Sequence, residues 1–112
     1  MSLKLAGHLF TGPFPIDSTE LRANQTPVVF AIIAKGGPAW SPVFRVVDVG
    51  ASPDEGIRFV AHVRRADWTA EPGETLGLYL LELARSAYAL ADRERLAAEL
   101  RGRYDPPNGL VT

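Results

Sequence analysis

The segment Val43-Phe-Arg-Val-Val-Asp-Val49, followed by Gly50-Ala-Ser-Pro-Asp-Glu55, carries the strongest structural signal in this chain. The first part is apolar and β-branched, which predicts a strand, and Gly50 allows a tight turn at its end. The serine and the glutamate of the second part form a capping box, and the proline between them suits the first position of a helix. We therefore predict a strand over 43–49 and a helix over about 53–65.

A second apolar run, Val28–Ala34, precedes this segment and predicts a neighbouring strand. The loop between the two runs, residues 35–42, holds two glycines and two prolines and does not continue either strand. A loop of this kind suits an antiparallel hairpin. Because both runs are apolar at nearly every position, we expect each face of the sheet to be covered, and helices to supply the cover.

Two further segments complete the expected core. Residues 76–83 fit either a third strand or, continued into 83–85, one long helix; we prefer the strand because Gly77 and Tyr79 suit it better and because two strands alone make a marginal sheet. Residues 86–103 are rich in Ala, Leu, Glu and Arg, which predicts a helix. Its inward stripe is expected to comprise Leu90, Ala97 and Arg101, with Leu96, Leu100 and Tyr104 alongside.

The 112 residues are enough for a single domain with one core. Residues 1–26 are expected to form an irregular N-terminal segment, because Gly12-Pro13-Phe14-Pro15 opposes regular structure, and 27–109 to form the core. The predicted fold class is α/β (α+β), with a small, mainly antiparallel three-stranded sheet flanked by helices.

Composition narrows the classes of function. The net charge of −1 argues against a domain built mainly to hold a nucleic-acid backbone. No apolar run approaches the roughly 20 residues that span a bilayer, and the N-terminus lacks the apolar segment of a secretory signal. The chain has no cysteine, which removes disulfides and thiolate metal sites. We therefore expect a cytoplasmic protein that does not associate with membranes.

The order of hairpin, capped helix, strand, long helix and Pro-Pro tail, together with local residues, resembles the GIY-YIG nuclease superfamily, and more closely its small bacterial relatives. The first family motif falls on Val28-Val29-Phe30 and the second on Asp48-Val49-Gly50. Arg58 and His62, one helical turn apart, match the arginine and its partner on the family's helix. Asn108 matches an asparagine near the end of the domain. The resemblance covers the predicted core and implies a GIY-YIG-like fold.

Several positions depart from the family pattern. Phe30 lacks the hydroxyl of the expected tyrosine, and Asp48 puts a carboxylate where a phenol is expected. Ala97 stands where the metal-binding glutamate belongs, so Glu94, one turn back on the same face, is the candidate metal ligand. The resemblance implies Mg²⁺ or Mn²⁺ as the cofactor of an active enzyme. Its gaps imply that the nuclease activity is lost or weak.

The resemblance also assigns roles to individual residues. Arg58 would stabilise a charged phosphate and His62 would assist proton transfer, so these are the candidate catalytic residues. The alternative is a surface arginine and a partly buried histidine without a catalytic role. The candidate ligand-binding residues are Phe30, Asp48, Gly50, Arg65 and Asn108.

Asp48 is the unusual residue of its strand, because it interrupts an apolar run. Simple alternation places it on the same face as Phe44 and Val46. A buried carboxylate has to be paired or hydrogen-bonded. We therefore expect a salt bridge from Asp48 to Arg58 just beyond Gly50, and we favour a structural role for it over cation binding.

Three functions remain open from the sequence. The first is a divergent GIY-YIG-like domain with little or no nuclease activity that binds a nucleic-acid or phosphate-bearing ligand around Arg58, His62 and Arg65. The second is an active metal-dependent phosphodiesterase or endonuclease that uses Glu94 or Asp48. The third is a protein-interaction module without catalysis, in which Trp40 and its loop contact a protein partner or a second copy of the chain.

Overall fold

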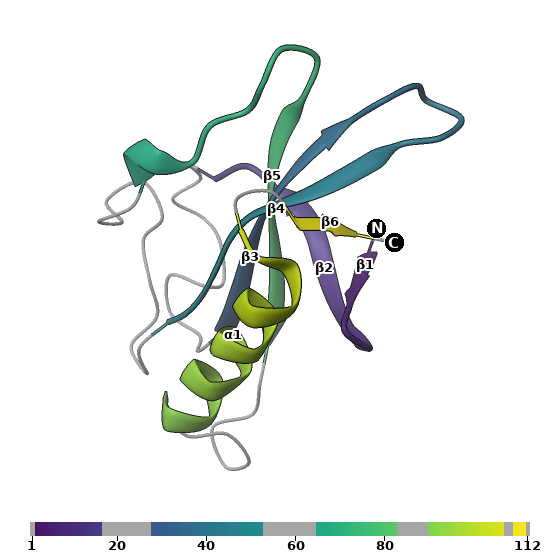
Figure 1. Ribbon diagram of the computed structural model, residues 1–112. Coiled ribbons are helices and arrows are strands. Elements are labelled where there is room, and N and C mark those ends of the chain that lie inside the picture. The colour runs from purple at the N-terminus through teal and green to yellow at the C-terminus, as the bar shows by residue number, and fades with distance from the viewer. Residues whose placement is uncertain (1, 17–27, 53–64, 83–89, 107–108, 112) are drawn as a thin grey trace.

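The structure is a computed structural model that describes residues 2–16, 28–52, 65–82, 90–106 and 109–111. Figure 1 shows the elements along the chain: strands β1 (Ser2–Leu5), β2 (His8–Phe14), β3 (Val28–Gly36) and β4 (Val43–Ala51), the short 3-10 helix η3 (Arg65–Asp67), strand β5 (Thr75–Glu82), helix α1 (Leu90–Tyr104) and strand β6 (Gly109–Val111). Within these ranges no helix is long and apolar enough to cross a bilayer.

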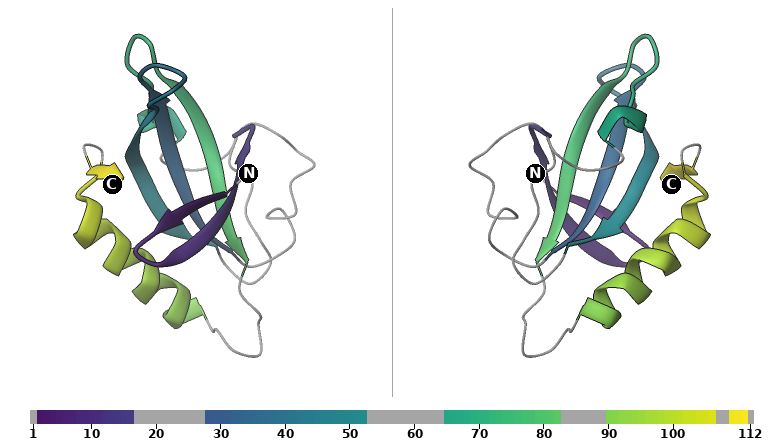
Figure 2. Two further views of the ribbon diagram at one scale, coloured as in Figure 1. Left: turned by 90° about the vertical axis from the view of Figure 1, so that its right-hand side faces the viewer. Right: turned by 90° about the vertical axis from the view of Figure 1, so that its left-hand side faces the viewer.

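The strands form one antiparallel sheet in the order β1-β2-β5-β3-β4-β6. Strand β3 is central, because residues 29–36 pair with β4 and residues 28–35 pair with β5. Figure 2 shows that the sheet curls into a half-barrel and that α1 lies along one side of it. The predicted antiparallel hairpin is confirmed, and so is the choice of a strand over a helix for residues 76–82.

The predicted fold class is wrong: the described residues form mostly sheet with one helix, not a three-stranded sheet flanked by helices. The three expected strands are present as β3, β4 and β5, but β1 and β2 extend the sheet on one side and β6 on the other, so the described part of the sheet has six strands. The described ranges contain a single α-helix, α1, which packs on one face of the sheet. The helix expected over 53–65 lies outside the described residues except for its last residue, which begins η3.

The N-terminal segment, which we expect to be irregular, forms a hairpin. Strands β1 and β2 pair along their length, and Leu5 and Phe10 are fully buried. Gly12 and Pro13 argue for a break because proline has no amide proton to donate to a ladder. The register between β2 and β5 shifts between residues 11 and 14, which is where the structure accommodates these two residues.

Two apolar clusters cover the two faces of the sheet. The helix-side core comprises Leu5, Phe10, Val29, Ala31, Ile33, Val46, Val49, Tyr79, Ala97 and Leu100. The Trp68-side core, on the other face, comprises Ile16, Val28, Phe30, Ile32, Ala34, Val47, Trp68, Leu78 and Leu80. Both faces are covered, as expected, but in the described part of the chain a helix covers only the first. Trp68 and Ile16 lie over the second.

Helix α1 confirms residues 90–103 of the helix predicted over 86–103, and residues 86–89 lie outside the described residues. Its buried residues are Arg93, Ala97 and Leu100. Leu90 is 38% exposed and Arg101 is also exposed, so the prediction that these two residues belong to the buried stripe is wrong. The buried face is shifted because a fully buried arginine, Arg93, stands one turn before Ala97.

A bulge in β4 decides which side chains share a face. The register between β3 and β4 shifts between Ile32 and Ile33, so β4 carries one extra residue, Val47. Beyond the bulge, the alternation of side chains is reversed relative to the preceding part of the strand. Asp48 therefore does not share a face with Val46, which belongs to the helix-side core, and that expectation is wrong.

Candidate functional site

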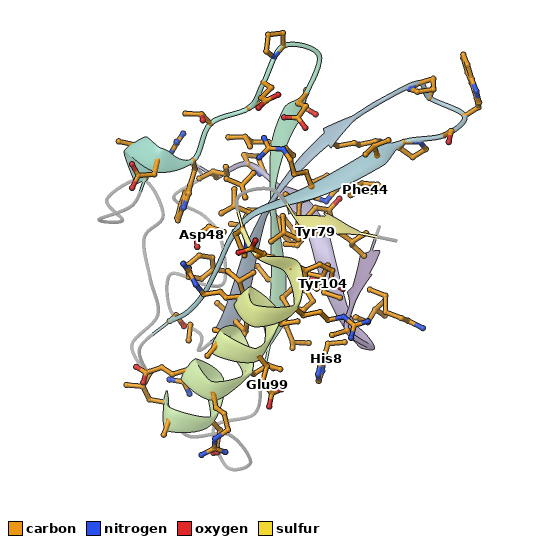
Figure 3. The ribbon with its side chains drawn as sticks, viewed as in Figure 1. His8, Phe44, Asp48, Tyr79, Glu99 and Tyr104 are labelled. Atoms are coloured by element: carbon orange, nitrogen blue, oxygen red, sulfur yellow. The ribbon has the colours of Figure 1, made fainter. Side chains whose placement is uncertain are left out.

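Asp48 lies at the centre of a polar cluster that joins the sheet, the segment before β5 and helix α1. Its carboxylate accepts hydrogen bonds from the Val49 amide (2.9 Å), from Trp68 Nε1 (2.8 Å) and from the guanidinium of Arg101, with which it also forms an ion pair. Arg101 donates a further hydrogen bond to the Val49 carbonyl oxygen (3.2 Å). Figure 3 shows Asp48 on β4 beside α1. We call Asp48, Trp68 and Arg101 the Asp48 cluster.

The partners of Asp48 compensate the charge of a carboxylate that is almost fully buried. The side chain of Asp48 is 8% exposed and that of Arg101 is 44% exposed. One carboxylate oxygen accepts from the Val49 amide and from Arg101, and the other accepts from Trp68. A buried charge that is paired and hydrogen-bonded in this way is stable where it lies. The pairing with Arg58 stays a prediction, because Arg58 lies outside the described residues; the cation that the structure places on Asp48 is Arg101.

Ser52 fastens the end of β4 to β3 and to α1. Its amide donates to the Val28 carbonyl oxygen (2.9 Å), and its hydroxyl accepts from the Val28 amide (2.8 Å). The buried guanidinium of Arg93 donates from Nε to the Ser52 carbonyl oxygen (3.1 Å). The hydroxyl that the sequence suggests as a helix cap accepts from a strand amide, and the helix that it would cap lies outside the described residues, so the capping role stays a prediction.

Two candidate ligand-binding residues belong to the packed interior. Phe30 is fully buried, with its ring edge-on to that of Trp68 at a centroid distance of 5.9 Å and an interplanar angle of 62°. Gly50 lies within β4, paired with Phe30, and is buried. The tight turn expected at Gly50 is therefore wrong, because the strand continues past it to Ala51.

The other candidates are dispersed or undescribed. Arg65 is half-buried at the start of η3, and its carbonyl oxygen accepts from the Trp68 amide (3.2 Å). Glu94 is exposed on α1, two turns before Arg101 and therefore about 10 Å away along the helix axis. The remaining candidates lie outside the described residues, so their roles stay predictions: Arg58, His62 and Asn108.

The described residues do not fit a divalent cation at this site. Within the described ranges, no three His, Cys, Asp or Glu side chains gather into a group that could hold a metal ion. The carboxylate of Asp48 is occupied by the Arg101 guanidinium, whose positive charge repels a cation. Glu94 lies two turns further along α1 and does not join Asp48 in a shared site.

The loop between β3 and β4 carries a second feature, a large apolar side chain in water. Trp40 is 87% exposed, and Val43, at the start of β4, is 48% exposed. The turn that contains Trp40, residues 38–41, is held by a hydrogen bond from the Ser41 amide to the Pro38 carbonyl oxygen (3.0 Å). Figure 1 shows the hairpin projecting from the body of the sheet, away from α1. We call Trp40 and Val43 the hairpin tip.

An ion pair braces the base of this hairpin. Arg45 on β4 donates from Nε and Nη2 to the two carboxylate oxygens of Glu74, at 3.2 and 2.8 Å, and both side chains are mostly buried. The Glu71 amide also donates to Glu74 (3.0 Å). The hydrogen bond from Arg45 lowers the pKa of Glu74, and the same bond raises the pKa of Arg45. The hairpin tip therefore projects from a base tied to the segment before β5.

Comparison of the chain with models of known protein families, with curated proteins and with solved structures finds no match. The relation to the GIY-YIG superfamily therefore stays a prediction, and the function has to be argued from the Asp48 cluster and the hairpin tip.

Proposed function

We propose that this chain is a non-catalytic binding module whose hairpin tip contacts a protein partner. The observation that carries the proposal is a tryptophan, Trp40, left 87% exposed on a hairpin with a braced base. A tryptophan side chain can bury about 200 Å² on contact, and tryptophan is enriched among the residues that dominate binding energy. A rigid base lowers the conformational entropy lost when such an anchor binds.

The first partner to test is a second copy of the chain. In a two-fold symmetric dimer the same patch packs against itself, so two hairpin tips can bury each other. Each tip offers two exposed apolar side chains, Trp40 and Val43. We further propose that the module acts in the cytoplasm, where a chain without cysteine needs no oxidising environment.

The Asp48 cluster supports the non-catalytic part of the proposal. To bind Mg²⁺ or Mn²⁺, Asp48 would have to give up the hydrogen bonds from Trp68 and Arg101 and leave an indole N–H buried without an acceptor. Its present partners instead suit a residue that holds α1 against the sheet. The nucleic-acid or phosphate ligand depends on Arg58 and His62, and we treat it as an outcome of the tests.

Sedimentation and tryptophan emission test the hairpin tip. We expect the wild-type chain to self-associate with rising concentration and the emission of Trp40 to shift to the blue as it leaves water. Trp40→Ala is expected to weaken association by about 30-fold, the effect of losing a hot-spot residue. Leu9→Ala, which removes another exposed apolar side chain, is the matched control and is expected to change nothing. A wild-type chain that stays monomeric throughout contradicts the second copy as partner.

Two further assays address the rival functions. Incubation with plasmid DNA and Mg²⁺ or Mn²⁺ is expected to give no cleavage; cleavage that Arg58→Ala abolishes would establish the phosphodiesterase instead. A salt-dependent mobility shift of labelled DNA or RNA that survives Trp40→Ala would favour the nucleic-acid ligand.

A further inference from the structure

A small hollow lies between β2, β3 and β5, at the base of the hairpin. Its volume is about 50 Å³, and its lining includes Pro13, Lys35, Thr75, Gly77 and Tyr79. A cavity of about 10–15 Å³ by the same measure already holds one water molecule, so the hollow has room for a group larger than a single water.

Gly77 lets Pro13 pack directly against β5 at the edge of the hollow. A Cβ at this position would lie 2.7 Å from Cβ of Pro13, closer than packed atoms approach, and 3.6 Å from Cε1 of Tyr79. The edge of the Tyr79 ring that carries the hydroxyl therefore lies beside Gly77, and both residues line the hollow.

Tyr79 brings a buried donor without a partner to this space. The residue is 3% exposed, and none of the residues that the structure describes forms a hydrogen bond with its hydroxyl. Burial raises the pKa of the Tyr79 phenol, so it keeps its proton at neutral pH. A buried tyrosine hydroxyl normally finds an acceptor, which points to a ligand or solvent oxygen in the hollow.

The rim adds positive charge and a hydroxyl. Lys35 and Thr75 are paired across β3 and β5, and both side chains are exposed. Lys35 lies two residues beyond Ile33 on β3, which puts both on the same face of the sheet as Tyr79. The lining includes no carboxylate. A phenol that donates, an ammonium and a hydroxyl together favour an anionic acceptor.

We propose that this hollow binds a carboxylate group, with the Tyr79 hydroxyl donating to one oxygen and the Lys35 ammonium balancing the charge at the rim. The volume suits the carboxylate of a small organic acid or of a peptide terminus. The site lies on β3 and β5 and does not depend on what the hairpin tip binds.

The test is a titration of the ¹⁵N-labelled chain with sodium acetate, followed by the amide resonances of Gly77 and Tyr79, against sodium chloride at equal ionic strength. We expect saturable shifts with acetate at millimolar concentration and none with chloride. Tyr79→Phe keeps the ring and removes the donor, and is expected to weaken binding by about fivefold. Lys35→Gln is also expected to weaken it.

Two control variants separate the site from general effects. Tyr104→Phe removes a hydroxyl that accepts from the Ala6 amide elsewhere, and Arg103→Gln removes an exposed cation from α1; neither is expected to change acetate binding. The same spectra show whether each variant is folded. Shifts that do not saturate, that chloride reproduces, or that Tyr79→Phe leaves unchanged would overturn the proposal and leave water as the occupant.

A second pair of titrations identifies the source of the carboxylate. A short peptide with a free C-terminus is compared with the same peptide amidated at that end. Tighter binding of the free peptide than of acetate, with no binding of the amidated one, assigns the site to a chain terminus. Binding of acetate alone assigns it to a small acid.

Discussion

Replacing Asp48 by asparagine tests whether the Asp48 cluster ties the sheet to the helix. The substitution keeps the size of the side chain and removes its charge. Asparagine has a single acceptor oxygen and an NH₂ group that only donates. It therefore cannot accept from the Val49 amide, Trp68 and Arg101 together, and at least one of these donors loses its acceptor.

The magnitude follows from how well water can replace each lost partner. The Arg101 side chain is 44% exposed, so its guanidinium regains solvent and its loss costs about 0.5–1 kcal/mol. Trp68 is 2% exposed, so an indole N–H left without an acceptor costs about 1–3 kcal/mol. Together we expect the free energy of unfolding to fall by about 1.5–4 kcal/mol. For a chain of 112 residues this lowers Tm by about 6–16 °C.

Thermal and urea unfolding of the purified variants measure this loss. Asp92→Asn is the matched control, because Asp92 forms an exposed ion pair with Arg95 within α1 (3.1 Å) and its loss is expected to cost less than about 0.5 kcal/mol. A Tm for Asp48→Asn within about 2 °C of the wild-type value would refute the reasoning, since it would mean that the buried carboxylate contributes no more than an exposed one.

Further predictions concern the Arg45–Glu74 ion pair, the hydroxyl of Ser52 and two glycines. Arg45 lowers the pKa of Glu74, so this contribution to stability is present above about pH 4.3, the value for an unfolded glutamate, and is lost as the pH falls through the lowered value. In a plot of the free energy of unfolding against pH, Glu74→Gln is therefore expected to reduce the loss of stability below about pH 4.3 by less than about 1 kcal/mol. An identical loss in the variant and the wild-type chain would contradict this. Ser52→Ala leaves the first amide of β3 without its acceptor and is expected to cost about 1–3 kcal/mol in urea unfolding; a neutral result would show that the bond contributes nothing. Gly12→Ala places a Cβ 2.6 Å from a carbonyl oxygen of β5 and is expected to destabilise by about 1–3 kcal/mol. Gly102 lies on α1, and a Cβ there would have no atom within 4 Å, so Gly102→Ala is expected to raise the free energy of unfolding by about 0.5–1 kcal/mol. If both glycine variants changed the stability in the same direction, the packing described would be contradicted.

The central part of the sheet can be predicted from the sequence because its strands are continuous apolar runs. Residues 28–36 and 43–51 are bounded by glycine and proline, and 75–82 follows a Pro-Gly turn. The outer strands carry no such signal. β2 contains Gly12 and Pro13, residues that normally end a strand, and their acceptance depends on a register shift against β5, a distant segment.

The candidate site is only half predictable for a related reason. Asp48 stands out as a charged residue in an apolar run, and its need for partners follows from elementary electrostatics. Which partners it finds depends on the extra residue Val47, which reverses the alternation of side chains, and on where α1 packs. One signal was available for Trp68: a buried carboxylate needs donors, and an indole offers one that is easily buried.

The position of β5 in the sheet has a consequence for how the chain folds. β5 lies between the hairpins β1–β2 and β3–β4, although it follows both of them in the sequence. Each hairpin consists of local contacts and is expected to form early, whereas joining them waits for a segment synthesised later. Until residues 75–82 insert, the flanks of β2 and β3 that they will occupy are open to other strands. Assembly of the complete sheet is therefore expected to be a late, single event, and slow or crowded synthesis to favour association of chains through these open flanks.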